Sequence, residues 1–234
     1  MTDETLPAPP GPTAERWSQP QTVAGFATSP PNQVLVDYVS SELARAPGAR
    51  VLDIGCGAGR NAVPIARLGC RVLGLDNTWP MLVAGRDRAR ADADAAARAH
   101  FACARMDALP APDRSFDIVV AHGIWNLARS GAEFRRAVRK AARVARPGAG
   151  LFLFTFSRHT LRPGLVPVAG ESFVFTEFSG EPQCFFTEAQ VMEELAAGEF
   201  VRDPPGALTE YNRVPGALTA SGPAIYEGTF RRVG

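Results

Sequence analysis

One segment constrains this chain more than any other: an apolar run enters a glycine-rich turn, continues as a helix and returns as a second apolar run that ends in an acid. The first run is residues 51–54, the glycines are Gly55, Gly57 and Gly59, and the acid is Asp76. Glycine has no Cβ, so the backbone can turn sharply and a ligand can lie against it. Strand, glycine turn, helix, strand and acid together indicate a nucleotide-binding half of a doubly wound sheet.

The spacing of the glycines separates two ligand classes. The dinucleotide fingerprint is G-x-G-x-x-G, whereas this chain has G-x-G-x-G, with Asp53 two residues before the first glycine. With this motif the chain resembles the class I S-adenosylmethionine-dependent methyltransferases, whose first motif is (D/E)-x-G-x-G-x-G. The resemblance covers residues 46–157 and continues at Asp76, Asp107, residues 116–120 and residues 146–148.

The resemblance implies an α/β fold: a doubly wound, Rossmann-like, mostly parallel seven-stranded sheet with an antiparallel last strand and an N-terminal helical cap. Residues 1–12 are proline-rich and lack periodicity, which predicts a disordered tail. We assign residues 13–45 to the cap and residues 46–234 to the S-adenosylmethionine-binding domain, with a variable acceptor-pocket insert at about 158–185. The cap helices either cover the cofactor or simply pack on the sheet.

Hydrophobic periodicity and capping residues predict the individual elements. Strands are expected at residues 51–54, 70–75, 101–105, 115–121, 151–156, 200–202 and 224–232. Helices are expected at residues 14–26, 61–68, 82–100 and 132–145. Two more are expected after capping residues, one from Asn32 to about residue 45 and one at residues 188–197 after Thr187. Residues 171–178 are expected to form a strand or hairpin arm, and residues 158–169 and 211–213 to form loops.

The resemblance also implies where the cofactor binds. Asp53 is expected near the methionyl ammonium, and Asp76 is expected to accept hydrogen bonds from both ribose hydroxyls. Asp107 is expected to accept from the adenine amine, and the backbone N–H of Ala108 is expected to donate to an adenine ring nitrogen. Local alternatives stay open: a capping role for Asp53, a helix N-cap for Asp76, and a simple Asp turn for Asp107. The complete predicted cofactor set is Asp53, Gly55, Cys56, Gly57, Gly59, Asp76, Asn77, Met81, Asp107, Ala108 and His122.

The acceptor side is less defined, because a sulfonium already activates the methyl carbon and a base is needed only when the acceptor must lose a proton. His122 follows the fourth strand and is a candidate base or a structural histidine. His159 and Tyr211 are further candidates for catalysis. An aromatic acceptor pocket is predicted, although core packing also explains such residues. Its expected members are Trp17, Trp125, Phe173 and Phe175.

Composition limits the partners. The 234 residues suit one α/β domain with a cap, and the net charge of +1 indicates neither a nucleic-acid nor a membrane partner. The chain has no apolar stretch of membrane-spanning length and no secretory leader pattern, so we expect a cytoplasmic location. Its four cysteines are widely spaced and form no Cys/His cluster, so no metal site is expected. The chain is expected to be a monomer or a homodimer.

These observations together predict an enzyme of the S-adenosylmethionine-dependent methyltransferase type. It is expected to transfer a methyl group by in-line displacement to an O, N or S/chalcogen nucleophile of a small molecule. Two other classes stay open. One is a non-catalytic S-adenosylmethionine-binding module, and the other is an NAD-dependent oxidoreductase, against which the glycine spacing and Asp53 argue.

Overall fold

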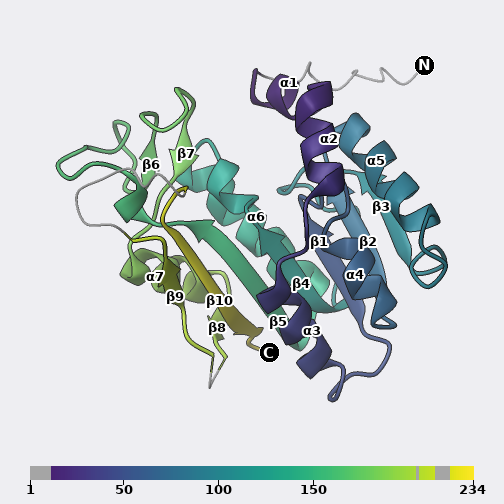
Figure 1. Ribbon diagram of the computed structural model, residues 1–234. Coiled ribbons are helices and arrows are strands. Elements are labelled where there is room, and N and C mark those ends of the chain that lie inside the picture. Colours follow the sequence, from purple (N-terminus) through teal and green to yellow (C-terminus); the bar gives the residue numbers. More distant parts are fainter. Residues whose placement is uncertain (1–11, 204–205, 214–221) are drawn as a thin grey trace, which may run out of the picture.

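A twisted, mostly parallel sheet runs through the centre of the molecule (Figure 1). The computed structural model describes residues 12–203, 206–213 and 222–234. Strands follow the order β3-β2-β1-β4-β5-β10-β8, and β9 also pairs with β10. Their bounds are β1 (Arg50–Ile54), β2 (Arg71–Asp76), β3 (Ala99–Cys103), β4 (Phe116–His122), β5 (Ala145–Phe156), β8 (Phe200–Arg202), β9 (Thr209–Tyr211) and β10 (Ile225–Arg232).

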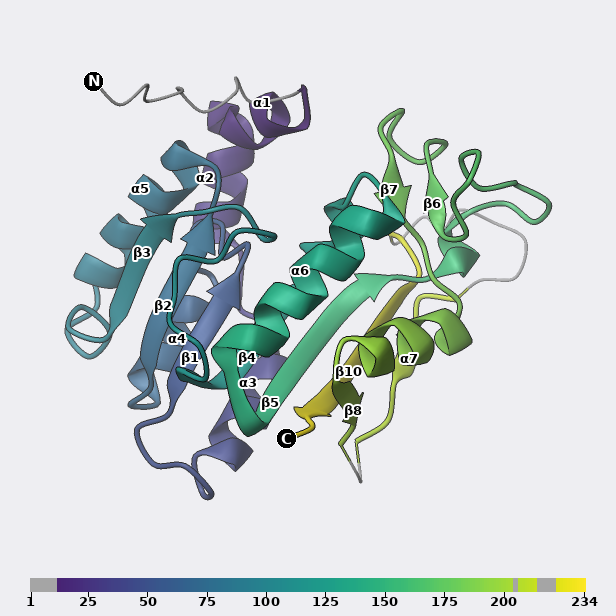
Figure 2. The same cartoon turned by 180° about the vertical axis from the view of Figure 1, so that it is seen from behind.

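Alternating side chains along the buried strands enter two separate cores, because successive residues of a strand face opposite sides of the sheet. On β4, Ile118 and Val120 pack into one core, while Val119 and Ala121 pack into the other. The first core is covered by α3 (Gln33–Glu42), α4 (Ala62–Arg67) and α5 (Trp79–Arg90). The second is covered by α6 (Gly131–Val144) and α7 (Glu188–Ala197), which lie in front of the sheet in Figure 2.

The predicted fold class is confirmed. Strands β1 to β5 are parallel, and β10 runs antiparallel to β5, as expected for the last strand. β8 and β9 both pair antiparallel with β10. The prediction of a loop at residues 211–213 is wrong at its first residue, because Tyr211 pairs with Ile225 at the end of β9.

The N-terminal cap contains two short helices before α3. The single helix predicted over residues 14–26 is wrong: α1 (Pro12–Ser18) and α2 (Pro20–Thr28) are separate, since Pro20 has no N–H to continue the first helix. Residues 1–11 of the predicted tail lie outside the described residues. The guanidinium of Arg88 on α5 donates to Ala27 O at 3.0 Å and Ser29 O at 3.1 Å, which ties the cap to the domain.

Two predicted helix caps are confirmed. At the start of α3, Asn32 Oδ1 accepts from Leu35 N at 2.9 Å. The helix ends at Glu42, three residues before the predicted end near residue 45. Thr187 and Gln190 form a capping box at the start of α7. Helix α5 is shorter than predicted and ends at Arg90, because the side chain of Asp92 accepts two backbone N–H groups of a following turn.

Strand β5 starts earlier than the sequence predicts. Helix α6 ends at Val144, so Pro147 and Gly148 lie inside β5 and do not terminate the helix. The insert at about 158–185 begins with the short helix η2 (Arg158–Thr160) and contains a two-stranded sheet of β6 (Val174–Phe175) and β7 (Gln183–Cys184). The hairpin arm predicted at 171–178 is thus a strand of two residues within longer loops.

The carboxyl ends of the parallel strands, the cap helices α1 and α2, and the β6–β7 sheet lie at the same end of the molecule (Figure 1). Ligands of open α/β sheets bind at this end. Across the three described stretches, no helix combines the length and the apolar character that a membrane crossing requires.

Candidate functional site

The glycine turn after β1 is held by hydrogen bonds from its backbone N–H groups to the end of β2. Gly55 N donates to Leu75 O at 2.7 Å, and Gly57 N donates to Asp76 Oδ2 at 2.9 Å. Gly55 has φ +71° and Gly57 has φ +52°, conformations that favour glycine. A Cβ on Gly55 would lie 2.6 Å from Ile124 Cγ1. The backbone of the turn is therefore fixed and bare, and both glycines line a cavity.

The third glycine has a different role. A Cβ on Gly59 would lie 3.0 Å from the ring of Phe101 on β3, and Gly59 lines neither of the two cavities at this end of the sheet. Cys56 is also buried and lines neither cavity; burial raises the pKa of its thiol. These two residues of the predicted cofactor set pack the turn against the fold.

Asp76 ends β2 and lines both cavities together with Asn77. Its Oδ1 accepts from Thr78 N at 2.8 Å, and its Oδ2 accepts from Gly57 N. The helix N-cap alternative is wrong, because Thr78 occupies the N-cap of α5. Burial raises the pKa of Asp76, and its hydrogen bonds partly offset this effect. Each carboxylate oxygen keeps a second lone pair for a ligand.

Asp53 lies under the turn, fully buried at the end of β1. Its Oδ2 has no hydrogen-bond partner among the described residues. Burial raises its pKa to about 7; Arg60 opposes this shift and Asp76 adds to it. An unpartnered buried carboxyl of this kind is costly without a ligand and favours a cationic group nearby.

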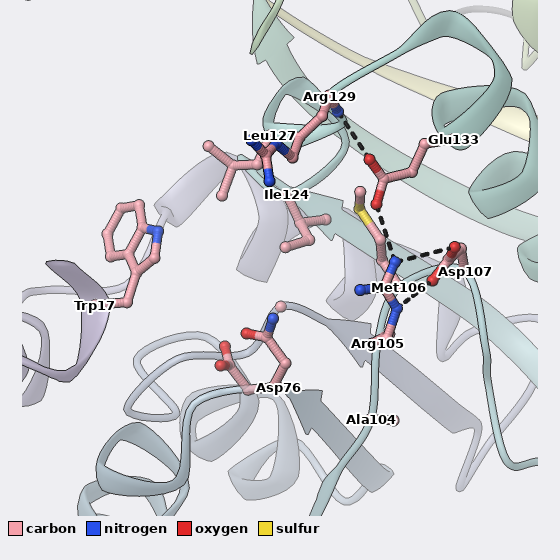
Figure 3. Close-up of a pocket in the computed structure, with 12 residues that line it drawn as sticks. Trp17, Asp76, Ala104, Arg105, Met106, Asp107, Ile124, Leu127, Arg129 and Glu133 are labelled. Carbon is pink, nitrogen blue, oxygen red and sulfur yellow. Dashed lines mark hydrogen bonds and ion pairs between the residues drawn. The ribbon is translucent and has the colours of Figure 1, made fainter. Parts of the chain in front are cut away.

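A first cavity of about 160 Å³ opens beside Asp76 (Figure 3), and Asn77 also lines it. Its far wall consists of charged side chains that are paired with one another. Glu133 Oε1 accepts from Arg105 Nη2 at 3.2 Å, and Glu133 Oε2 accepts from Arg129 N at 2.8 Å. Trp17 of the cap closes the opposite side.

Asp107 belongs to this wall, and arginines occupy both of its oxygens. Oδ1 accepts from Arg105 Nε at 2.9 Å, and Oδ2 accepts from Arg136 Nε at 2.8 Å. Burial alone would raise its pKa, but the hydrogen bonds from Arg105 and Arg136 outweigh burial and lower it. The predicted backbone donor Ala108 lines neither cavity, because its N–H donates to Arg105 O at 3.1 Å. Met106 lines the cavity in its place.

A second cavity of about 290 Å³ adjoins the first. The two share six lining residues: Trp17, Gly55, Asp76, Asn77, Ile124 and Leu127. Aromatic side chains from the cap, β5 and the insert form much of the second cavity, namely Trp17, Phe26, Phe154, Phe156 and Phe178. The predicted Met81 lines it as well, together with the polar residues Arg60, His122, Asn126 and Gln183.

His122 ends β4 and faces this second cavity. Its ring stacks on Phe154 with centroids 4.3 Å apart, and its Nε2 lies 3.1 Å from Asn32 Nδ2. Burial, together with the nearby charge of Arg60, lowers its pKa to about 3. The imidazole is therefore neutral near pH 7 and is a weak base.

The other two catalytic candidates lie elsewhere. His159 Nδ1 is 2.6 Å from Glu210 Oε1, and His159 lines neither cavity. Tyr211 lines a separate hollow with Val34 and Glu227, outside both cavities. The structure does not bring His159 and Tyr211 together with the glycine turn.

Of the four predicted acceptor-pocket residues, only Trp17 lines the cavities. Trp125 is fully buried and packs edge-on against Phe134. Phe173 packs on Phe134 and Phe186, and Phe175 packs near Phe185. All three belong to hydrophobic cores, so their predicted place in the pocket wall is wrong.

Sequence reasoning missed several lining residues. Arg60 had a signal, since it directly follows the glycine turn. Phe154 and Phe156 lie in an apolar run that predicts only a buried strand. Asn126 had a positional signal, since it follows the fourth strand, whose carboxyl end is expected to face the ligands. Gln183 gave no signal, because only the fold brings its segment, 57 residues further along the chain, to the same cavity.

Residues 51–148 match the model of a family described as a methyltransferase domain. The demethylmenaquinone methyltransferase of Renibacterium salmoninarum is 35% identical over 132 residues, which cover 56% of this chain and 49% of that protein. The chain thus spans about half the length of the relatives it matches.

Solved structures share the fold over nearly the whole chain. The (4+2)-cyclase SpnF superposes with a TM-score of 0.71 at 20% identity, covering 95% of this chain and 96% of SpnF. The 1,6-didemethyltoxoflavin-N1-methyltransferase of Burkholderia thailandensis, solved with 1,6-didemethyltoxoflavin and S-adenosylhomocysteine bound, gives 0.65 at 17% identity, covering 98% of this chain and 94% of that one. Likeness at such identities concerns the fold alone.

Proposed function

Because this chain belongs to the class I S-adenosylmethionine-dependent methyltransferases, we propose that it transfers a methyl group from S-adenosylmethionine to a small-molecule acceptor. The observation that carries the proposal is the bare turn at Gly55 and Gly57, flanked by Asp76 and the unpartnered Asp53, at the junction of two cavities. A cavity with a charged far wall and a larger cavity with five aromatic side chains in its lining meet there, which suits a donor and an aromatic acceptor.

The side chains around the glycine turn match the chemical groups of S-adenosylmethionine, the methyl donor. Asp53 lies beneath the turn and lines neither cavity, so its unpartnered carboxyl supplies negative charge below the methionyl ammonium. Arg60, which lines the second cavity, matches the methionyl carboxylate. Asp76 keeps lone pairs for the two ribose hydroxyls, and Asn77 and Met81 line the space beside it. Trp17 and Met106 line the first cavity, which leaves room for the adenine.

Bound S-adenosylmethionine supplies a methyl carbon that its sulfonium has already activated. The protein has to align the acceptor with that carbon and exclude water. Orientation of this kind lowers a barrier by roughly 7–11 kcal/mol. Trp17 of α1 lines one side of both cavities, and Phe26 of α2 lines the second; their rings meet edge-on with centroids 5.5 Å apart.

The acceptor end suits a flat aromatic molecule. Phe154, Phe156 and Phe178 form its walls, and Phe156 and Phe178 pack edge to face with centroids 5.3 Å apart. The names of the matched proteins support this choice, since one relative is a demethylmenaquinone methyltransferase and one structural neighbour holds 1,6-didemethyltoxoflavin. Since the pKa of His122 is about 3, we propose that the acceptor presents an anion or a free lone pair without general-base help.

Calorimetry with S-adenosylhomocysteine and with NADH tests the donor assignment. We expect binding of the nucleoside and none of NADH; tight binding of NADH alone would reverse the assignment to an oxidoreductase. Transfer of labelled methyl from S-adenosylmethionine to a panel of phenols, quinols, thiols and amines then tests the activity. Micromolar cofactor affinity with no transfer to any compound would favour a non-catalytic binding module.

A further inference from the structure

Two carboxamide side chains line the second cavity although they are almost completely buried. Asn126 belongs to the short helix η1 (Trp125–Leu127) after β4 and is 1% exposed, and Gln183 begins β7 and is 7% exposed. They reach the same cavity from two segments that are distant in the sequence.

The oxygens of both carboxamides lack hydrogen bonds. Within the part of the chain that the structure describes, neither Asn126 Oδ1 nor Gln183 Oε1 accepts from any group. Buried polar atoms are nearly always paired, because an unpaired one costs about 1–3 kcal/mol. Several other buried side-chain atoms of the described residues are also unpaired, among them Thr155 Oγ1 and Trp125 Nε1. Thr155 and Trp125 line neither cavity, however, whereas Asn126 and Gln183 both line the second one. The two unpaired oxygens therefore point to a ligand that supplies the donors.

The surroundings define the chemistry of that ligand. The walls next to the carboxamides are the rings of Phe154, Phe156 and Phe178, which favour a planar molecule. Asp76 is the single carboxylate among the described lining residues, and it stands beside the glycine turn; the lining cations are Arg16 and Arg60. This balance disfavours a cationic acceptor and suits a neutral or anionic one.

We propose that Asn126 and Gln183 select and orient the methyl acceptor, a planar aromatic compound that carries ring hydroxyl or ring N–H groups. Each carboxamide presents an acceptor oxygen and a donor NH₂ group, so the pair can hold a hydroxyl beside a carbonyl or a ring nitrogen. Contacts from two separate elements fix both the position and the face of the ring. The inference rests on the proposed methyl transfer, since it assigns the acceptor half of that site.

The test compares two probes of nearly equal size, 1-naphthol and 1-methylnaphthalene, by calorimetry in saturating S-adenosylhomocysteine. The variants are Asn126→Leu and Gln183→Met, which keep the shape and remove the amide. Gln33→Met, at an exposed glutamine of α3 outside both cavities, is the matched control. We expect the unmodified protein to bind 1-naphthol at least about tenfold more tightly, and each cavity variant to reduce that ratio below about threefold. The control should leave the ratio unchanged.

A second readout separates ligand recognition from a structural role. Replacing an unpaired buried amide by an apolar isostere removes a desolvation penalty, so each cavity variant should raise the melting temperature of the ligand-free protein by about 2–4 °C. A structural role predicts a decrease. A ratio that persists in both variants, or an unmodified protein that binds S-adenosylhomocysteine yet does not distinguish the two probes, overturns the inference and leaves the proposed function standing. Failure to bind S-adenosylhomocysteine overturns the proposed function itself.

Discussion

The two adjoining cavities share six residues, yet they differ in whether the polar groups that line them have hydrogen-bond partners. In the first cavity, Asp107 and Glu133 accept hydrogen bonds from Arg105 and from further donors, so the charged wall is satisfied by its own members. In the second cavity, the oxygens of Asn126 and Gln183 have no partner among the described residues. A cavity wall whose polar groups are hydrogen-bonded to one another is stable without a ligand and selects a ligand by shape. Unpaired polar groups lower the stability of the ligand-free protein, and their presence is explained by the ligand that they bind.

The largest expected effect comes from breaking the wall that both cavities share. Gly55→Ala should lower the free energy of unfolding by about 2–5 kcal/mol, because positive-φ strain of about 1–2 kcal/mol adds to the clash with Ile124. Gly48 has nearly the same φ, +70° against +71°, and a Cβ added there would meet open space. Gly48→Ala should therefore show the strain alone. Urea denaturation of both variants checks this, and equal losses would mean that Ile124 does not hold the turn.

The next effect concerns Asp76, which faces both cavities. Asp76→Ala should weaken S-adenosylhomocysteine binding by about 1–3 kcal/mol, since it removes charged hydrogen bonds to the ribose. Asp94, an exposed aspartate after α5, provides the matched control, and Asp94→Ala should leave the affinity unchanged. Calorimetry measures both variants. An unaltered affinity in Asp76→Ala would count against the ribose assignment.

A pH titration sharpens the comparison at Asp53, the unpartnered carboxyl below the turn. Its pKa is about 7 in the folded protein, against 3.8 for the exposed group, so the native state retains a proton that the unfolded chain has released. The contribution of Asp53 to stability is thus present below about pH 4 and is lost as the pH rises through 7.

A cation bound beside Asp53 favours its ionised form. S-adenosylhomocysteine affinity should therefore increase from pH 5 to pH 7, by at most about tenfold per pH unit, with release of a proton. Calorimetry in two buffers of different ionisation enthalpy counts that proton. Asp53→Asn should abolish the pH dependence, and a dependence that survives in this variant would place the titrating group elsewhere.

The smallest effect is expected at Asp107, where the predicted adenine contact competes with the arginines. Because Arg105 and Arg136 already occupy both oxygens, Asp107→Asn should lower the melting temperature while changing S-adenosylhomocysteine affinity less than about threefold. Thermal denaturation and calorimetry on one preparation separate the two quantities. A large loss of affinity with an unchanged melting temperature would restore the adenine role of Asp107 and make the first cavity as ligand-dependent as the second.

Local signals in the sequence were sufficient for the parallel half of the sheet and the donor end. The motif from Asp53 to Gly59 and the acid Asp76 predicted a glycine turn beside a carboxylate, and hydrogen bonds from Gly55 and Gly57 to the end of β2 form that turn. Prediction of helix ends was weaker. Helix α5 ends ten residues before the predicted position, because the side chain of Asp92 organises a turn that its alanine-rich surroundings do not reveal.

By itself, the amino-acid sequence determined the nucleotide-binding half of a doubly wound sheet, the glycine turn and the acids beside it, because each depends on the period of apolar residues or on glycine at fixed spacing along one segment. The antiparallel last strand was implied by the family resemblance. The tertiary structure decided which aromatic residues line the acceptor cavity and which fill the core, and it placed Trp125, Phe173 and Phe175 in the core. It also brought Asn126 and Gln183 to one cavity. The physical reason is that burial and pairing between distant segments depend on how strands and helices pack, which no local pattern records.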